Sequence, residues 1–258
     1  MISFPLRLWP LVSFAWVAAA DLSAVASAKA EPAIIAKARA YVGSEAALNA
    51  VKSIHFAGTL VTTNSVDPKA VERATVEIYF QAPEQQRIQA TSTKSIEVTA
   101  LDGYDAWQRQ QDAADSTKWQ VKLLGADQIK RLRANTWETL GFYRGIERHG
   151  GHIEDRGSAT MDGIACQKLA FIYAPNIIFY RYLNPATGHL VATETESGTT
   201  IREQGELSAG GLRFPKIIVT VTTNNAGQTQ TITLTFDKVT VNETLSAKLF
   251  TVPALSVK

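Results

Sequence analysis

The sequence predicts a mainly β protein with a few helices, built around a single antiparallel sheet. Apolar and polar residues alternate in segments from Ser53 to Phe236, which is typical of strands with one buried and one exposed face. Turn signals rich in Gly, Pro, Asn and Asp separate these segments. Because strands and helices do not alternate along the chain, we do not expect a parallel sheet.

The first thirty residues have the order of a secretory signal peptide: an early basic residue, an apolar run and then small residues. The apolar run is shorter than the about 20 residues that a membrane-spanning helix needs. We place the cleavage after Ala28 or Ala30, which leaves residues 31–258 as one exported domain. We therefore expect a periplasmic protein.

Two stretches have helical periodicity. Residues 32–52 predict a helix that breaks at Gly43-Ser44, with Ser44 capping the second piece. The second stretch runs from about Ala126 to Arg144, and Asp127 is placed to cap it. We expect roughly ten strands in the remainder.

Such a sheet has an apolar face that two short helices cover only in part. The sheet could close into a barrel, stay open around a cavity, or fold into a sandwich with a dry core. The first two arrangements are common in proteins that bind ligands.

Composition and motifs give little support for catalysis, metal binding or nucleic-acid binding. The 258 residues carry 26 basic and 24 acidic side chains, so no global field attracts nucleic acid. His149 and His152 have a spacing that could bind zinc, but three neighbouring arginines oppose a cation, and we expect a solvated loop. The single cysteine, Cys166, is expected to be a small buried hydrophobe.

A series of short motifs resembles the LolA/LolB-like proteins of outer-membrane lipoprotein sorting. The motifs span nearly the whole mature chain and occur in the family's order. They are the segments 36–58, Tyr79–Pro83, Asp102–Trp107, Met161–Leu169, Tyr182–Gly188, Gly211–Pro215 and Phe236–Asn242, followed by Leu249-Phe250 and Pro253.

This resemblance implies a strongly curved antiparallel sheet, an incomplete β-barrel, with helices plugging its concave face. It also implies a carrier that holds acyl chains of lipids or lipoproteins, needs no cofactor, and meets inner- and outer-membrane transport partners transiently. A hollow that takes two or three acyl chains could draw a lipid from a membrane, at about 0.8 kcal/mol for each buried methylene. We expect a monomer.

One position departs from the family pattern. The best-known carriers have a basic residue immediately before the Pro that ends the second long strand, and it holds the helical lid or the cargo. Here that residue is Ala82, and the nearest basic residue, Arg87, follows on the next strand. The lid mechanism of the family is therefore not transferred to this chain.

We predict that the ligand contacts the even-numbered apolar residues of the early strands, together with aromatic residues of a neighbouring strand and of the helical plug. The predicted ligand-binding residues are Phe56, Leu60, Val76, Ile78, Phe80, Ile88, Ile96, Val98, Trp107, Trp137 and Phe142.

Two other functions stay open beside the non-enzymatic lipid carrier. A sensor or scaffold module could use the same sheet for protein contact, with the hollow filled by its own side chains. A hydrolase or isomerase could use the same scaffold. An enzyme would need titratable groups converging in the hollow, and the predicted lining contains none.

Overall fold

The N-terminal helices form where the sequence predicts them. The computed structural model describes residues 31–253, so the predicted signal peptide lies outside the described residues. Helix α1 (Ala33–Val42) and helix α2 (Glu45–Asn49) are separated at Gly43. The Ser44 Oγ accepts a hydrogen bond of 3.2 Å from the Ala47 backbone N–H, which confirms the predicted cap.

The third helix, α3 (Ala126–Gly141), lies in the second predicted stretch but has different ends. The cap is Gly125, whose backbone N–H donates to the Gln128 side chain at 3.2 Å, so the prediction of an Asp127 cap was wrong. The helix ends short of the predicted limit because Phe142 has a φ of 47°, a left-handed conformation that terminates helices.

Thirteen strands, more than the roughly ten that we predicted, form one antiparallel sheet among the described residues. They are β1 (Ser53–Asn64), β2 (Glu72–Gln81), β3 (Gln85–Thr91), β4 (Ser95–Asp102), β5 (Asp105–Asp112), β6 (Trp119–Leu123), β7 (His152–Met161), β8 (Ile164–Ala174), β9 (Ile177–Leu183), β10 (Leu190–Thr195), β11 (Thr200–Ala209), β12 (Leu212–Thr223) and β13 (Thr229–Val241).

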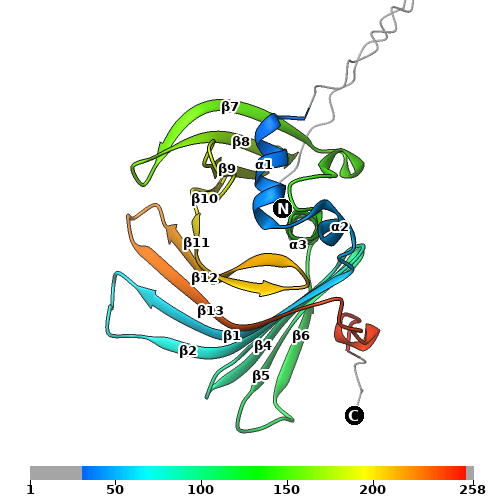
Figure 1. Ribbon diagram of the computed structural model, residues 1–258. Helices are drawn as coiled ribbons and strands as arrows, with labels where there is room; N and C mark the ends of the chain where they lie inside the picture. Colours follow the sequence, from blue (N-terminus) through cyan, green and yellow to red (C-terminus); the bar gives the residue numbers. More distant parts are fainter. Residues whose placement is uncertain (1–30, 254–258) are drawn as a thin grey trace, which may run out of the picture. The chain divides into compact units, whose positions relative to one another are not determined.

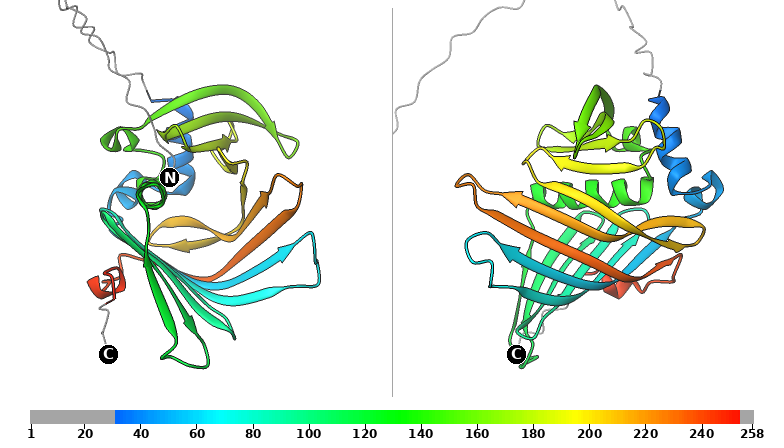
Figure 2. Two further views of the ribbon diagram at one scale, coloured as in Figure 1. Left: turned by 180° about the vertical axis from the view of Figure 1, so that it is seen from behind. Right: turned by 60° about the vertical axis from the view of Figure 1, so that its left-hand side comes forward.

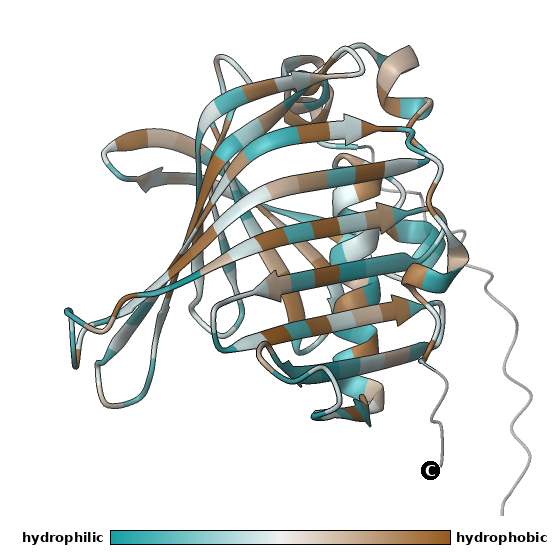
Figure 3. Ribbon diagram, turned by 90° about the horizontal axis from the view of Figure 1, so that it is seen from below, coloured by the Kyte–Doolittle hydropathy of each residue, from teal (hydrophilic) through white to brown (hydrophobic). Residues whose placement is uncertain are grey.

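The sheet is open, with β6 at one edge and β7 at the other. Its order is β6-β5-β4-β3-β2-β1-β13-β12-β11-β10-β9-β8-β7, and it curls so that both arms face the helices (Figure 1). Hydrophobic and hydrophilic residues alternate along many of the strands (Figure 3). This arrangement confirms the predicted incomplete barrel and excludes the closed barrel and the sandwich. The shortest strand pairing in the sheet is that of β10 with β11, where the register pairs Thr193 with Ile201 and Glu194 with Thr200.

The helices lie on the concave side of the sheet. Helix α3 runs across the space between the β7–β10 arm and strands β1–β6 (Figure 2). Helix α1 packs against the turn after β9, where a Cβ on Gly188 would approach the carbonyl carbon of Lys37 to 2.4 Å. None of the described helices is long and apolar enough to cross a bilayer.

A buried arginine holds the three helices together. Arg39 of α1 is 3 % exposed and forms two hydrogen bonds with the Glu45 carboxylate, of 2.8 and 2.7 Å. Its Nη1 donates to the carbonyls of Gly141 and Phe142, at 3.1 and 2.8 Å. A guanidinium at these carbonyls satisfies acceptors that the end of α3 leaves without a partner.

The C-terminal segment crosses the convex face and is fixed there by side chains of the early strands. It includes the short 3₁₀ helix η2 (Ala247–Leu249). A second short 3₁₀ helix, η1 (Ile146–His149), precedes β7. The indole N–H of Trp107 donates to the Phe250 carbonyl at 2.8 Å, and Arg87 donates to the Leu249 carbonyl at 3.0 Å. Phe250 itself is fully buried.

Candidate functional site

A cavity of about 350 Å³ lies between the concave face of the sheet and helix α3. Most of its apolar wall comes from β1, β2, β12 and β13, the strands that the sheet order places at its centre. Phe56 is the hub of this wall. Its ring centroid lies 4.8 Å from that of Phe236, 5.6 Å from that of Phe214 and 6.5 Å from that of Phe80.

Five of the residues predicted to contact a ligand line this cavity: Phe56, Ile78, Phe80, Ile88 and Phe142. The register explains the grouping, because Phe56 pairs with Ile78 and Ile78 pairs with Ile88 across three neighbouring strands. Side chains of directly paired residues lie on the same face of a sheet.

Three further predicted residues lie near the cavity without lining it. Val76 is buried in the same hydrophobic cluster as Phe56. Leu60 lies further along β1 and lines a separate depression between β1, β2 and β3. Trp137 of α3 packs on the opposite cluster, and its ring stacks on His149 at a centroid distance of 3.8 Å.

The remaining three predicted residues, Ile96, Val98 and Trp107, lie on the convex face. The predicted even-numbered phase fails here because β3 pairs with β4 as Gln89 with Val98 and Ile88 with Thr99. Thr99 therefore shares the concave face with Ile88, whereas Val98, 5 % exposed, packs with Trp107 beneath the C-terminal segment.

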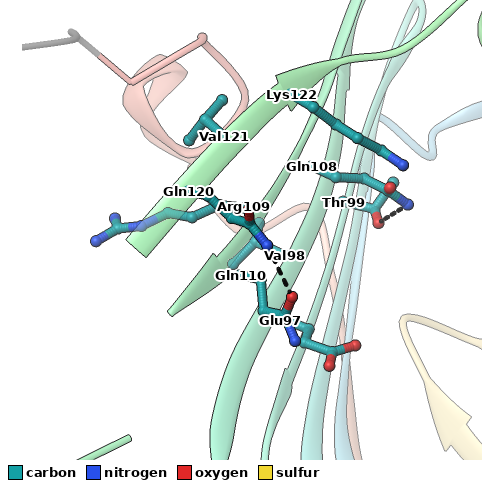
Figure 4. A pocket seen from close by; sticks show the side chains of 9 residues that line it. All are labelled: Glu97, Val98, Thr99, Gln108, Arg109, Gln110, Gln120, Val121 and Lys122. Atoms are coloured by element: carbon teal, nitrogen blue, oxygen red, sulfur yellow. Dashed lines mark hydrogen bonds between the residues drawn. The ribbon is translucent and has the colours of Figure 1, made fainter. Parts of the chain in front are cut away.

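Beyond β3 the concave face is apolar where Leu101 and Ala106 pack against α3, and polar farther along the strands. A shallow pocket over β4, β5 and β6 has Thr99, Gln108 and Lys122 on one side of the strands and Arg109 and Val121 on the other (Figure 4). The apolar lining of the cavity thus ends at β3, nearer to the centre of the sheet than the sequence predicted.

Charged side chains form the opposite end of the cavity, on α3 and β9. Arg181 donates to Glu138 Oε2 through Nε at 3.0 Å and through Nη2 at 2.5 Å. The Tyr173 hydroxyl donates to the other Glu138 oxygen at 2.6 Å, and Arg181 Nη1 donates to the Thr193 hydroxyl at 3.2 Å. Burial opposes the charge of Arg181, but Glu138, together with Tyr143 and Glu203, more than offsets burial and raises the arginine pKa.

Glu203 of β11 brings a second carboxyl group to this end of the cavity. Burial raises its pKa, and the nearby Arg181 guanidinium offsets only part of the effect. Among the described residues no hydrogen-bond donor contributes to its pKa. Tyr143 also lines the cavity, and burial raises its pKa as well.

Titratable groups therefore do converge in the hollow, contrary to the expectation from the predicted lining. Sequence reasoning followed the early strands and missed Glu138, Arg181 and Glu203. One signal was available: Arg181 shares the phase of Phe179 in the apolar segment Ile177–Leu183, and a charge in a buried phase needs a buried partner.

The two histidines considered for metal binding and the single cysteine do not line the cavity. His149 stacks on Trp137 and is partly buried, so the expected solvated loop is only half correct. His152 contacts Glu154 at 3.2 Å. Cys166 is 3 % exposed within β8, as predicted for a small hydrophobe. Across residues 31–253, no group of three or more His, Cys, Asp and Glu side chains is arranged to hold a metal ion.

An open curved sheet with helices on its concave side defines a protein of LolA-like fold, and solved structures share it. A DUF1329 family protein from Desulfovibrio piger has a TM-score of 0.53 at 10 % identity, with 85 % of this chain and 96 % of that one covered. An outer membrane lipoprotein-sorting protein domain from Vibrio parahaemolyticus has a TM-score of 0.52 at 9 % identity, covering 83 % and 94 %.

A LolA superfamily protein from Nitrosomonas europaea has a TM-score of 0.51 at 12 % identity, with 82 % of this chain and 98 % of that one covered. No protein-family model matches the sequence, and no curated protein matches it. At these identities the likeness concerns the fold alone, and it confirms the fold that the sequence motifs implied.

Proposed function

We propose that this protein is an exported, non-enzymatic lipid binder that holds an acyl chain in the cavity between its sheet and helix α3. The observation that supports this most directly is the apolar wall around Phe56, which borders about 350 Å³ of space instead of closing into a dry core. Ligand pockets are commonly about 300–1,000 Å³ and mostly apolar.

The cavity size supports one chain rather than two or three. A water molecule takes up about 30 Å³ of liquid volume, so the cavity has room for about a dozen groups of that size. Each buried methylene contributes about 0.8 kcal/mol, so a chain of ten contributes on the order of 8 kcal/mol before the costs of association. Such a balance favours reversible binding, which a carrier needs.

The charged end of the cavity supports binding rather than catalysis. Glu138 and Arg181 satisfy each other, and Tyr173 occupies the second carboxylate oxygen. Glu203 then remains as a single carboxyl group, and nucleophilic catalysis needs a nucleophile with an adjacent base. We propose a periplasmic location and transient handover to membrane partners, with an acylated lipoprotein as one candidate cargo.

The test is native mass spectrometry of the exported, mature protein, followed by organic extraction and lipid analysis. We expect a bound amphiphile with one acyl chain in the cavity. An empty protein that also fails to take up an apolar fluorescent probe would contradict the proposal and favour a protein-contact module.

Two substitutions show whether binding uses the cavity. Ile88→Glu introduces a charge at the cavity wall, on a residue that is only partly buried, and should abolish probe uptake while the protein stays folded. Val61→Glu is the matched control, because Val61 is next to Leu60 on β1 and therefore points to the other face of the sheet. It should bind as the wild type does.

A further inference from the structure

The two ends of the cavity differ in chemistry along a single row of paired residues. Across three adjacent strands the register aligns Leu234 of β13 with Ile218 of β12, and Ile218 with Glu203 of β11, and all three residues line the cavity. Neighbouring strands are about 4.8 Å apart, so two apolar residues and one carboxyl span about 10 Å. An extended acyl chain along this row would place its head group at Glu203.

The charge of the arginine beside this carboxyl is already paired with a carboxylate. Arg181 already donates to Glu138 through Nε and Nη2 and to Thr193 through Nη1. The other arginine that lines the cavity, Arg213, has a side chain that is 53 % exposed, and its guanidinium lies 3.7 Å from Glu206. An anionic head group would therefore compete with Glu138 for the charge of Arg181 or stay at the rim near Arg213.

The groups that remain can bind hydrogen-bond donors. The Glu203 carboxyl accepts hydrogen bonds, and the hydroxyls of Thr193 and Tyr143 both donate and accept. Glu138 and the paired Arg181 give a combined charge near zero, so any net charge at this end comes from Glu203 and is negative. This combination attracts hydroxyl, amide N–H or ammonium groups and repels carboxylates and phosphates.

We propose that the end of the cavity at Glu203 is a head-group site that selects amphiphiles whose head donates hydrogen bonds and carries no negative charge. The proposal rests on the lipid-binding function proposed above and deepens it. It assigns to Glu203 the role of discriminating between lipids that have the same acyl chain.

The test compares three twelve-carbon amphiphiles as competitors of an apolar fluorescent probe bound to the mature protein. Dodecylamine, 1-monododecanoylglycerol and dodecanoate share one chain and differ in the head group. Near neutral pH we expect the amine and the glyceride to displace the probe at concentrations roughly tenfold lower than dodecanoate, because a hydrogen bond to a charged group contributes about that factor.

Variants of Glu203 separate the head-group effect from chain binding. Glu203→Leu should bind all three compounds with similar affinity. Glu203→Gln should keep the preference for the glyceride and lose that for the amine, and because it is nearly isosteric it also decides the question if the leucine variant does not fold. Gln204→Leu is the control, since Gln204 is the next residue of β11 and is exposed.

Each outcome bears on a different proposal. Tightest binding of dodecanoate by the wild type, or equal binding of all three, would overturn the head-group site and leave lipid binding standing. A probe that the wild type never takes up, or that no amphiphile displaces, would overturn lipid binding itself.

Discussion

The two walls of the cavity are stabilised by different interactions. On the wall of β1, β2, β12 and β13, Phe56 contacts three other phenylalanine rings, and each contact contributes a small share. At the opposite end, Glu138 and Arg181 depend on each other. An apolar wall weakens gradually when one residue is trimmed, whereas a buried ion pair fails when either member is removed.

The largest expected effect comes from breaking this ion pair. Arg181→Ala leaves Glu138, whose side chain is 5 % exposed, without its counter-charge. Removing one partner of a buried pair typically costs 3–5 kcal/mol, so we expect a loss of about that size in the free energy of unfolding, measured by urea denaturation. A loss below about 1 kcal/mol, the upper range for exposed pairs, would show that water already reaches the pair.

A double substitution sharpens the same comparison. Replacing both members by apolar residues of similar size, Arg181→Met with Glu138→Leu, removes the unpaired charge. We expect this variant to regain most of the stability that Arg181→Ala loses, with Tyr173 left without its acceptor.

A smaller effect is expected on the apolar wall than in the core beside the charged end. In that core, Phe171 of β8 is fully buried against Arg181 and Tyr143, and Phe171→Ala should cost the 3 kcal/mol or more that is usual for a core phenylalanine. Phe56→Ala should cost less, about 2 kcal/mol, because the ring already borders empty space and loses fewer contacts. Equal losses in thermal unfolding would mean that the cavity wall is packed as tightly as the core.

The same two regions show how far the sequence determines the architecture. The period-two pattern and the turns predicted the open antiparallel sheet, and the lining of β1 to β3 followed from the phase of Phe56, Ile78 and Ile88. The prediction failed at β4, because an even-numbered phase does not survive the turn between strands. Pairing Gln89 with Val98 turns Val98 outward, and only the register reveals this.

The charged end could not be predicted because its members are far apart in the chain. Glu138 lies on a helix, and Arg181 and Glu203 lie on strands that pair with neither the helix nor each other. Local periodicity describes one element at a time. A charge in an apolar phase, as at Arg181, predicts that a partner exists without identifying it.

The smallest expected effect is a gain in stability from Glu203→Gln. The pKa of Glu203 is raised in the folded protein above its ordinary value of 4.5, chiefly by burial. The stability that the protonated carboxyl gives the folded protein is therefore fully present below pH 4.5, and it is lost as the pH rises toward the folded pKa. The glutamine variant does not titrate, so its advantage should be absent in acid and grow above pH 4.5.

Near neutral pH we expect this advantage to be about 1 kcal/mol, at the lower end of the cost of an unsatisfied buried polar group, or about 2–4 °C in Tm. The groups that face Glu203 contribute little to the change, because the pKa values of Arg181 and Tyr143 are both raised and neither loses a proton in this range. Ile201→Val, a neutral change on the same strand, should shift Tm by the same amount at every pH. A glutamine variant whose Tm difference from the wild type is constant between acid and neutral pH would show that the pKa of Glu203 is the same in the folded and the unfolded chain, so that burial does not oppose its charge.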